Sequence, residues 1–407
     1  MKRTVKDENS APAGPLAGVR VVDLTQIVYG AYATAILGDL GADVIKIEAP
    51  DPSGNFGDAM RWPGHPPEGA APGLGPIFLT LNRNKRSIAL DLADDDDKAL
   101  LRALLASADV FATNVRMNSL EKLGFSYAQL RAEFPNLIFA HAAGYGSDGP
   151  YAGAPAYDDI IQAQSGLSDL WPRVSSGEPP RYLPTLIADK TAALFMAYSI
   201  MAALFHRERT GEAQMVEVPM LEAVTSFLLV EHLFDQSYDP PTGEWAYPRM
   251  TNPNRRPYRT RDGWIAVMPY SDQNWRDFFH LATGSEQLAD DPRINSISAR
   301  SKNYAFLYET VAGLLGSRST DEWAALFSEK SIPYGRVNRL SDLKEDPHLQ
   351  AVGFFERREH PHVGAYVTPK HPVRFSASPP SIRRDAPRWD EHRQEIIAEL
   401  EGWIARK

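Results

Sequence analysis

The sequence contains no cysteine among its 407 residues, which rules out disulfides, thiolate catalysis and cysteine metal sites. Positive charge is not in excess, because 43 Lys and Arg stand against 52 Asp and Glu, a net charge of −9. This balance gives no support to nucleic-acid binding, which needs clustered positive charge. The most apolar run, Ala192–Phe205, is too short to span a bilayer and contains Tyr198 and Ser199. The polar first residues lack the apolar segment of a signal peptide, so we expect a cytoplasmic protein with no membrane or nucleic-acid partner.

Several common catalytic motifs are also missing. The turn after the first expected strand, Leu24–Gly30, carries no GxGxxG, and the sequence has no P-loop lysine motif, no GxSxG and no HExxH. His360 and His362 flank Pro361 in an expected surface turn, and their neighbours are not ligand-like, so we predict no metal site. These absences leave a carboxylate as the strongest remaining nucleophile.

The sequence does contain β-branched runs that alternate with helical segments. We expect helices at Ala31–Leu40, Asp94–Ala108 and Ser126–Glu133. We expect strands at Val19–Leu24, Asp43–Glu48, Ser87–Leu92, Val110–Thr113, Leu137–Ala142 and Gln214–Pro219. Strands that alternate with helices predict a parallel sheet with right-handed crossovers, and so an α/β fold.

The pattern changes after the last of these strands. We expect a second, smaller α/β domain at 225–325, with a strand at Gly263–Met268 and helices at Tyr304–Leu315 and Thr320–Lys330. The large open, Rossmann-like α/β domain then consists of 1–224 and 326–407. A terminal helix follows Arg388, and its apolar residues predict that it docks on the large domain; they are Ile396, Ile397, Leu400 and Ile404.

The best-placed carboxylate belongs to Asp189. It precedes a long run of helix formers, Lys190–Arg209, which ends in a basic turn and Gly211. Asp189 is therefore expected to cap the helix, facing its free backbone N–H groups, and a plain cap is the simpler interpretation of the local sequence. The apolar run predicts a helix buried on nearly all sides, and the neighbouring Lys190 favours an ionised Asp189.

A glycine-dense segment, Gly144–Pro150, precedes the acidic pair Asp158 and Asp159. Glycines at this density let a backbone approach a ligand closely. A plain turn explains the same local pattern.

Six stretches of the sequence carry a resemblance to a known family when they are taken together and in order, although each alone is a weak signal. They are Pro15–Asp23, Leu40–Pro50, Leu81–Leu92, Asn114–Phe125, Gly144–Leu167 and Ile187–Met220. In this order the sequence resembles the family III CoA-transferases (the CaiB/BaiF family), which include formyl-CoA transferase and carnitine CoA-transferase. The resemblance implies a CoA-transferase whose subunits form an interlocked, ring-like homodimer. It also implies no tightly bound cofactor, with an acyl-CoA thioester and a carboxylic acid as substrates.

The resemblance also implies roles for particular residues. Asp189 aligns with the catalytic aspartate, which forms an anhydride with the acyl group and then a thioester with CoA. Asp158 aligns with an acidic residue beside this nucleophile, and Arg116, Lys122 and Arg61 are candidates for the CoA phosphates. The full set of residues expected to line the CoA site is Val28, Tyr29, Arg61, Leu90, Asn114, Val115, Arg116, Lys122, Tyr157 and Asp158.

The sequence departs from formyl-CoA transferase in ways that leave alternatives open. Basic residues of its CoA site align near Ala49, Ala93 and Pro155, which are uncharged. The glycine-rich loop that covers its site has no counterpart here, because the region near Tyr247–Arg259 is Pro- and Arg-rich instead, which argues against a formyl/oxalate pair. There Arg255, Arg256 or Arg259 is a candidate for a second carboxylate, although a solvated arginine is the simpler interpretation.

Two other functions remain open alternatives. An α-methylacyl-CoA racemase of the same family is one, although its catalytic histidine corresponds to Tyr157, a poor base at neutral pH because the reference pKa of tyrosine is about 10. A CoA-binding protein without turnover is the other, and the presence of Asp189 at the helix start disfavours it.

Overall fold

The computed structural model describes residues 14–50 and 56–406, which divide into two compact units. The larger unit comprises Met1–Ser165, Tyr182–Phe227 and Gln350–Lys407, and the smaller unit comprises Gly166–Arg181 and Leu228–Leu349. The expected domain limits at 225 and 325 stay a prediction. The chain therefore leaves the larger unit and returns to it twice.

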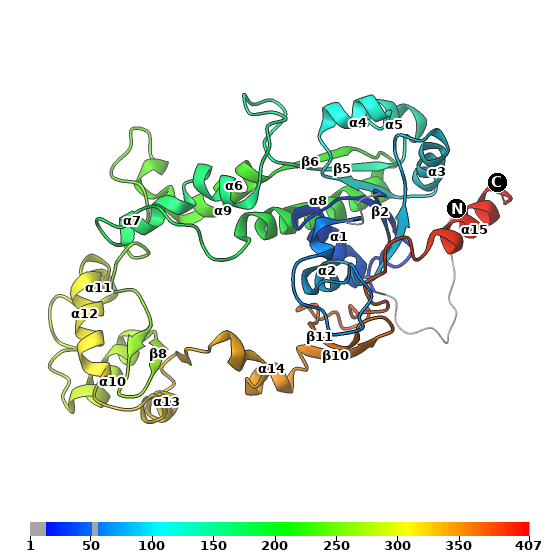
Figure 1. The fold of residues 1–407 in the computed structure, drawn as a ribbon. Helices are drawn as coiled ribbons and strands as arrows, with labels where there is room; N and C mark the ends of the chain where they lie inside the picture. Colours follow the sequence, from blue (N-terminus) through cyan, green and yellow to red (C-terminus); the bar gives the residue numbers. More distant parts are fainter. Residues whose placement is uncertain (1–13, 51–55, 407) are drawn as a thin grey trace. The chain divides into compact units, whose positions relative to one another are not determined.

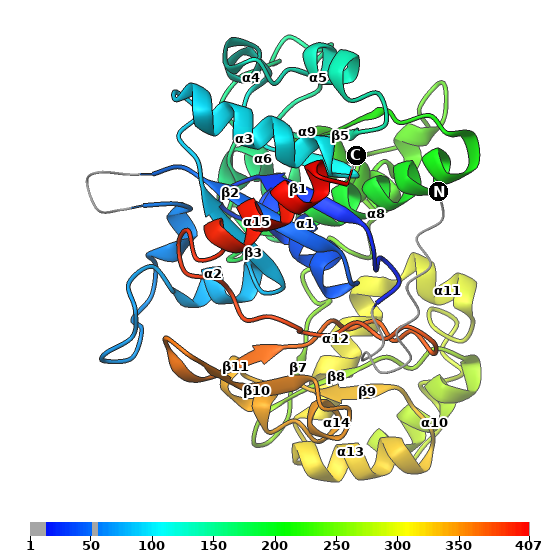
Figure 2. The same cartoon turned by 90° about the vertical axis from the view of Figure 1, so that its right-hand side faces the viewer.

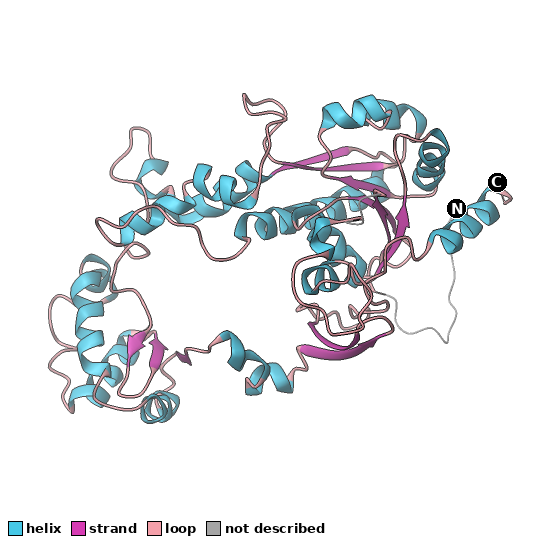
Figure 3. Ribbon diagram, in the orientation of Figure 1, coloured by secondary structure: helices cyan, strands magenta, loops and turns pink. Residues whose placement is uncertain are grey.

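A six-stranded parallel sheet forms the centre of the larger unit, with strand order β3-β2-β1-β4-β5-β6. The strands, drawn as arrows in Figure 3, are β1 (Arg20–Leu24), β2 (Asp43–Glu48), β3 (Lys85–Ala89), β4 (Val110–Thr113), β5 (Ile138–Ala143) and β6 (Met215–Pro219). The predicted parallel α/β sheet is thus confirmed. Because β2 and β3 extend the sheet from β1 in one direction and β4 to β6 in the other, the order reverses between β1 and β4, where open α/β sheets bind ligands.

Both faces of this sheet are buried, because successive side chains of a strand point to opposite faces. Val21 packs with helices α1 (Tyr29–Asp39) and α8 (Ile187–Thr210), whereas Val22 packs against helices of the other face. The helices of that other face are α3 (Asp95–Ala106), α4 (Met117–Leu123), α5 (Tyr127–Glu133) and α15 (Arg393–Ile404). Figure 1 shows α3, α4 and α5 together on one side of the strands.

The terminal helix α15 docks on the larger unit as predicted. Ile396 and Leu400 are buried in the core that contains Val22, and Figure 2 shows the helix beside β3. Ile404 is 57% exposed, so this last apolar residue does not take part. The helix starts at Arg393 rather than close behind Arg388.

The larger unit has further elements outside the predicted helices and strands. They are η1 (Ala59–Arg61), α2 (Pro76–Leu81), α6 (Asp158–Gln164), β10 (Phe355–His360) and β11 (Gly364–Pro369). Helices α9 (Met220–His232) and α14 (Pro347–Ala351) belong to the segments that leave and re-enter this unit. The expected loop Pro50–Gly75 contains η1, and its residues 51–55 lie outside the described residues.

Helix α8 is longer and more exposed than predicted. It runs from Ile187 to Thr210 and ends at Gly211, whose φ of 78° suits glycine. The prediction of burial on nearly all sides was wrong, because Leu194, Tyr198 and Phe205 are each more than half exposed. Of the helices in the described residues, α8 is long and apolar enough to cross a membrane, but half of its apolar window is buried and one such helix is weak evidence.

The smaller unit has its own aromatic core around Trp275, Phe278, Phe279, Trp323 and Phe327. Its antiparallel sheet joins β7 (Tyr258–Arg259), β8 (Trp264–Val267) and β9 (Tyr334–Arg336). Its helical elements are η2 (Leu167–Asp169), α7 (Leu170–Val174), η3 (Phe234–Ser237), α10 (Asp272–Thr283), α11 (Ile297–Lys302), α12 (Tyr304–Leu315), α13 (Thr320–Glu329) and η4 (Leu340–Lys344).

Candidate active site

Asp189 lies in the first turn of α8 and is not its cap. The helix begins at Ile187, and its N-cap residue, Leu186, makes no side-chain hydrogen bond to the backbone. The sequence-based assignment of Asp189 as the N-cap was therefore wrong. A helix that starts without a capping side chain leaves backbone N–H groups to be satisfied from elsewhere.

Asp158 supplies the missing cap from the start of α6. Its Oδ1 accepts hydrogen bonds from the backbone N–H groups of Ala188 (2.7 Å) and Asp189 (3.0 Å). Its Oδ2 accepts a third from Nε2 of Gln162 at 2.6 Å. The carboxylate of Asp158 is 5% exposed and is used to hold the start of α8, the turn that carries Asp189.

The Asp189 carboxylate has the opposite environment. The residue is 7% exposed, and no described residue donates a hydrogen bond to its side chain. Burial, and then the negative charge of Asp158, raise the pKa of Asp189 to about 7. A buried carboxylate with few donors is both more basic and less solvated than an exposed one, which makes it a better nucleophile.

Lys190 does not act on Asp189 as the sequence suggested. Its Nζ donates to Oγ1 of Thr185 at 2.5 Å, and the pKa of Asp189 is raised rather than lowered. Adjacent residues of a helix point in different directions, so neighbouring positions in the sequence do not form a pair.

The charge of Asp189 acts on Tyr29, the first residue of α1. Burial, and then the charges of Asp189 and Glu217, raise the pKa of Tyr29 well above its ordinary value. Its hydroxyl donates to the carbonyl of Val218 at 2.5 Å, which ties α1 to the end of β6. The hydroxyl of Tyr29 therefore stays protonated and is held by the carbonyl of Val218.

The loop between β1 and α1 lies where the strand order reverses. It is held there by Asn114, which follows the neighbouring strand β4. Nδ2 of Asn114 donates to the carbonyl of Gln26 (2.9 Å), and the Gln26 N–H donates to Oδ1 of Asn114 (3.1 Å). Val115 follows, and its carbonyl lies 3.1 Å from Nε2 of His141. Asn114 therefore lies beside the loop that leads to Val28 and Tyr29.

Ile27 in this loop has a φ of 69°, which is unfavourable for a β-branched residue. Its N–H donates to Oδ1 of Asp58 at 3.1 Å. Nζ of Lys46 donates to the carbonyl of Thr25 (2.8 Å) and to Oδ2 of Asp58 (2.9 Å), and both charged side chains are fully buried. A strained residue persists only where its surroundings fix it, and this buried pair does so.

Arg61 does not fit its expected role with a CoA phosphate. Its guanidinium is buried, and Nε and one terminal nitrogen donate to the two oxygens of Glu48 at 2.8 and 2.5 Å. The other terminal nitrogen donates to the carbonyls of Gly73 and Pro387. We therefore correct this assignment, because the donors of Arg61 are used inside the protein.

The other predicted residues differ in exposure. Arg116 precedes α4 and Lys122 lies in it, and both residues are exposed. No described residue forms an ion pair with either, so both have donors for a phosphate. Tyr157 is 62% exposed. The side chain of Leu90 is buried in the core behind β3, so only its backbone can reach a ligand.

The glycines of Gly144–Pro150 are explained by close approach within the protein. A Cβ on Gly144 would lie 2.3 Å from Cβ of Ala156, and one on Gly146 would lie 2.6 Å from Oε1 of Glu222. The segment forms turns, in which the Gly149 N–H donates to the carbonyl of Gly146 at 3.2 Å. The turn interpretation accounts for these residues without a ligand.

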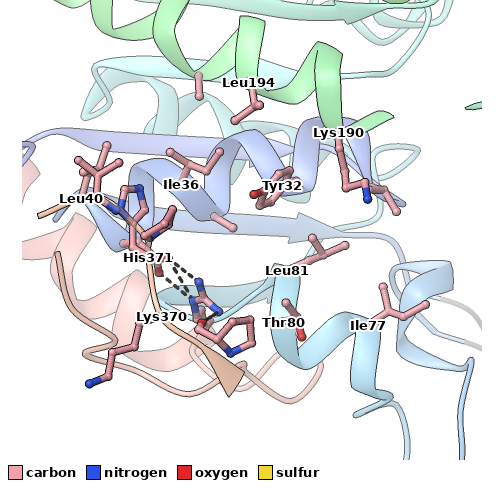
Figure 4. Close-up of a pocket in the computed structure, with 18 of the residues that line it drawn as sticks. Tyr32, Ile36, Leu40, Ile77, Thr80, Leu81, Lys190, Leu194, Lys370 and His371 are labelled. Carbon is pink, nitrogen blue, oxygen red and sulfur yellow. Dashed lines mark hydrogen bonds and ion pairs between the residues drawn. The ribbon is translucent and has the colours of Figure 1, made fainter. Parts of the chain in front are cut away.

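A groove of about 880 Å³ lies along α8 and was not foreseen from the sequence (Figure 4). Helices α1, α2 and α8 and the segment after β11 line it, with mostly apolar side chains such as Tyr32, Ile77 and Leu194. Val28 and Lys190 reach it, whereas Asp189 is not among its lining residues. This groove is therefore a neighbour of the candidate nucleophile and does not contain it.

The described residues contain no cluster of three or more His, Cys, Asp or Glu that could hold a metal ion. His360, one of the histidines considered in the sequence, is buried with Nε2 2.9 Å from the carbonyl of Ala386. Its Nδ1 accepts the backbone N–H of His362 at 3.0 Å. These contacts give His360 a structural role.

An open parallel α/β sheet, with a buried carboxylate near the reversal of strand order, defines a class of enzyme that binds a ligand at the strand ends. The family model described as CoA-transferase family III matches residues 16–393. The chain belongs to this family, and it is a transferase.

Similar proteins agree with this assignment. A probable fatty acyl-CoA transferase of Mycobacterium tuberculosis is 34% identical over 340 residues, 79% of this chain and 82% of the relative. A succinate–glutarate CoA-transferase of Agrobacterium fabrum is 30% identical over 399 residues, 95% of this chain and 96% of the relative. The crystal structure of a CAIB/BAIF family protein from Brucella suis matches with a TM-score of 0.78 and 29% identity, covering 95% of this chain and 100% of that one.

Proposed function

We propose that the protein moves CoA from an acyl-CoA donor to a carboxylic acid, with Asp189 as a covalent catalyst. The observation that carries this proposal is the carboxylate of Asp189, which is buried, receives no hydrogen bond from a described residue and has a pKa raised to about 7. An unsolvated carboxylate is costly to keep in a folded protein, and such groups cluster at functional sites.

In the first half-reaction a carboxylate oxygen of Asp189 attacks the carbonyl carbon of the donor thioester. A C–O bond forms, the C–S bond breaks, and CoA leaves as the thiolate from an aspartyl anhydride. The thiolate then attacks the carbonyl carbon of Asp189. The anhydride bond to Asp189 breaks, the donor acid leaves with its carboxylate, and an aspartyl-CoA thioester remains.

The second half-reaction runs the same steps with the acceptor acid. Its carboxylate attacks the aspartyl thioester, which frees CoA as the thiolate and gives a new anhydride. The thiolate attacks the acceptor carbonyl, which releases the acceptor acyl-CoA and restores the Asp189 carboxylate. No water or ATP takes part, because the energy of the thioester stays in covalent bonds throughout.

The residues near Asp189 and in the loop between β1 and α1 have separate roles in this mechanism. Asp158 holds the turn that carries Asp189, and its charge raises the basicity of that carboxylate. The Thr25–Val28 loop, fixed by Asn114 and the Lys46–Asp58 pair, offers a rigid backbone to CoA. Arg116 and Lys122 are the cations that we assign to its phosphates. Tyr29 is buried and lies within the electrostatic influence of Asp189.

We also propose that the protein is a homodimer whose subunits cover the exposed apolar face of α8. Leu194 and Tyr198 are more than half exposed and lie on the same helix face as the groove of about 880 Å³. Apolar patches of this kind mark interfaces between subunits. Light scattering after gel filtration should give a dimer for the parent, and L194E should shift it towards the monomer, whereas a monomeric parent would contradict the proposal.

The function is tested with a panel of acyl-CoA donors and carboxylic acids, with the products identified by mass spectrometry. CoA should appear on the second acid in the parent, and D189A should abolish this transfer. D159A is the matched control, because Asp159 is the exposed neighbour of Asp158 and has no role in the proposal. Transfer at the parent rate in D189A would overturn the mechanism. Deuterium entry into a 2-methylacyl-CoA in heavy water, without any second acid, would indicate racemase activity instead.

A further inference from the structure

The smaller unit contains a cavity of its own, of about 370 Å³, which is within the range of small-molecule sites. It lies at the edge of the β7-β8-β9 sheet beside α12. Its lining includes Arg255, Arg256, Tyr258, Met268, Tyr308 and Tyr334. None of the residues that line it is an aspartate or a glutamate.

The two arginines of this cavity lack the carboxylate partners that other arginines of the unit have. Arg261 pairs with Glu322 at 2.9 Å, Arg276 with Asp290 at 3.0 Å, and Arg293 with Asp291 at 2.7 Å. Within residues 228–349, all of which the structure describes, no carboxylate lies in ion-pair range of Arg255 or Arg256. In a chain with a net charge of −9, a cavity lined by two cations without carboxylate partners attracts an anionic ligand.

The phenols of the cavity add neutral donors to these cations. Oη of Tyr308 accepts a hydrogen bond from Nε of Arg249 at 3.0 Å, so its own O–H is left to donate. Burial, and then the neighbouring Tyr308, raise the pKa of Tyr258, which therefore stays protonated and can also donate. Arg255 and Arg256 act in the opposite direction on this pKa, so their field at the Tyr258 oxygen favours a negative charge.

The rest of the wall is apolar and includes Val267, Met268 and Pro333. A free phosphate would satisfy the arginines but would leave this wall without a partner. A carboxylic acid satisfies both, because its carboxylate accepts bidentate hydrogen bonds from guanidinium groups and its carbon chain packs on the apolar wall.

We propose that this cavity binds a small dicarboxylic acid, with one carboxylate on Arg255 and Arg256 and the carbon chain against Met268 and the tyrosine rings. The inference rests on the proposed function in one respect only, which is that this acid is the acceptor of CoA.

The test is calorimetric titration of the full-length protein, without CoA, using glutarate as the probe. R255Q/R256Q should bind glutarate about 10- to 100-fold more weakly than the parent, because two charge-assisted contacts are lost. R261Q/R276Q is the matched control, since it removes the same charge from two arginines outside the cavity that pair with carboxylates, and it should bind within about twofold of the parent. R255K/R256K keeps the charge without the planar fork and should fall between.

Two further probes define the ligand. Glutaramide, which has the same carbon chain and no charge, should not bind measurably, and inorganic phosphate should bind more weakly than glutarate. Equal binding of glutarate by R255Q/R256Q and the parent would overturn the proposal. So would equal binding of glutaramide, or tighter binding of phosphate.

The two proposals can fail separately. If the parent transfers CoA to no acid but R255Q/R256Q still loses glutarate binding, the cavity proposal stands and the proposed function falls. If transfer occurs and glutarate binding does not depend on these arginines, the cavity proposal alone falls. When both hold, R255Q/R256Q raises KM for the acid while KM for the acyl-CoA donor stays unchanged, and D189A binds glutarate like the parent.

Discussion

Two regions of the larger unit with buried carboxylates can be compared, because Asp189 in one lacks the partners that the carboxylates of the other have. Beside β1 and β2, Asp23, Glu48 and Asp58 are buried with cations and several hydrogen-bond donors, and the pKa of each is lowered. At the start of α8, Asp189 is buried without such partners, and its pKa is raised to about 7. Burial alone raises the pKa in every one of these cases, so the partners decide the outcome.

The difference separates a structural role from a catalytic one. The Lys46–Asp58 pair holds Thr25 and Ile27 in a strained loop and has no group left for chemistry. Asp189 is positioned through its backbone, by Asp158, so its carboxylate remains free to react. A protein can thus place a charge in its interior either to fix a chain or to keep a nucleophile reactive.

The largest effect is expected from D189N, which removes the nucleophile while keeping its shape. Transfer activity should fall by at least about 1000-fold, because an amide cannot form the anhydride. Steady-state kinetics with an acyl-CoA and an acid provides the measurement. D159N, at an exposed position, serves as the control and should keep nearly all of the activity.

The next effect concerns the other region and is one of stability. K46M leaves Asp58 buried without its cation, and should lower the free energy of unfolding by about 3 to 5 kcal/mol. Urea denaturation at pH 7.5 measures this change. D95N, which breaks an ion pair at the exposed start of α3, should leave the urea midpoint unchanged. Equal sensitivity of the two variants would contradict the assignment of a structural role to the buried pair.

D189N should act on stability in the opposite direction to K46M. The raised pKa means that the folded state holds the Asp189 proton more tightly than the unfolded state, so ionisation in the folded state costs stability. D189N should therefore stabilise the protein by roughly 1 to 4 kcal/mol at pH 8. The gain is complete above pH 7 and should disappear as the pH falls towards 3.8. A variant that is less stable than the parent at pH 8 would show that Asp189 has partners in the folded protein.

The smallest effect is on the pH dependence of activity. Because Asp189 must be ionised to attack, kcat/KM should rise with pH around a midpoint near 7. D158N keeps an oxygen that can accept the N–H groups of α8 but removes the neighbouring charge, so the midpoint should move down by about one pH unit. An unchanged midpoint in D158N would mean that burial alone sets the basicity of Asp189.

Much of the fold of the larger unit could be predicted from periodicity. Short β-branched runs gave the parallel strands, because strands buried on both faces must be apolar throughout, and β2 and β4 match their predicted limits. β3 begins at Lys85 rather than Ser87, because Lys85 and Arg86 are buried in contact with carboxylates. The apolar pattern that predicts a strand does not include buried cations, because their carboxylate partners lie far away in the sequence.

The errors at the site have the same origin. Asp189 was taken as the helix cap because the true cap, Asp158, comes from another helix 31 residues earlier in the chain. Arg61 was taken as a phosphate ligand because nothing in its neighbourhood shows the contact with Glu48. The exposed apolar face of α8 was missed because apolar composition does not tell a core from an interface.

Oxygen transfer tests the central claim most directly. In the proposed mechanism the bridging oxygen of the second anhydride comes from the acceptor acid, and it stays on Asp189 when CoA attacks the acceptor carbonyl. After a single turnover with an acid labelled with ¹⁸O in its carboxylate, mass spectrometry should find one heavy oxygen in the peptide that contains Asp189, and none in the peptide that contains Asp23. Transfer of CoA to the labelled acid with no label on Asp189 would contradict the account.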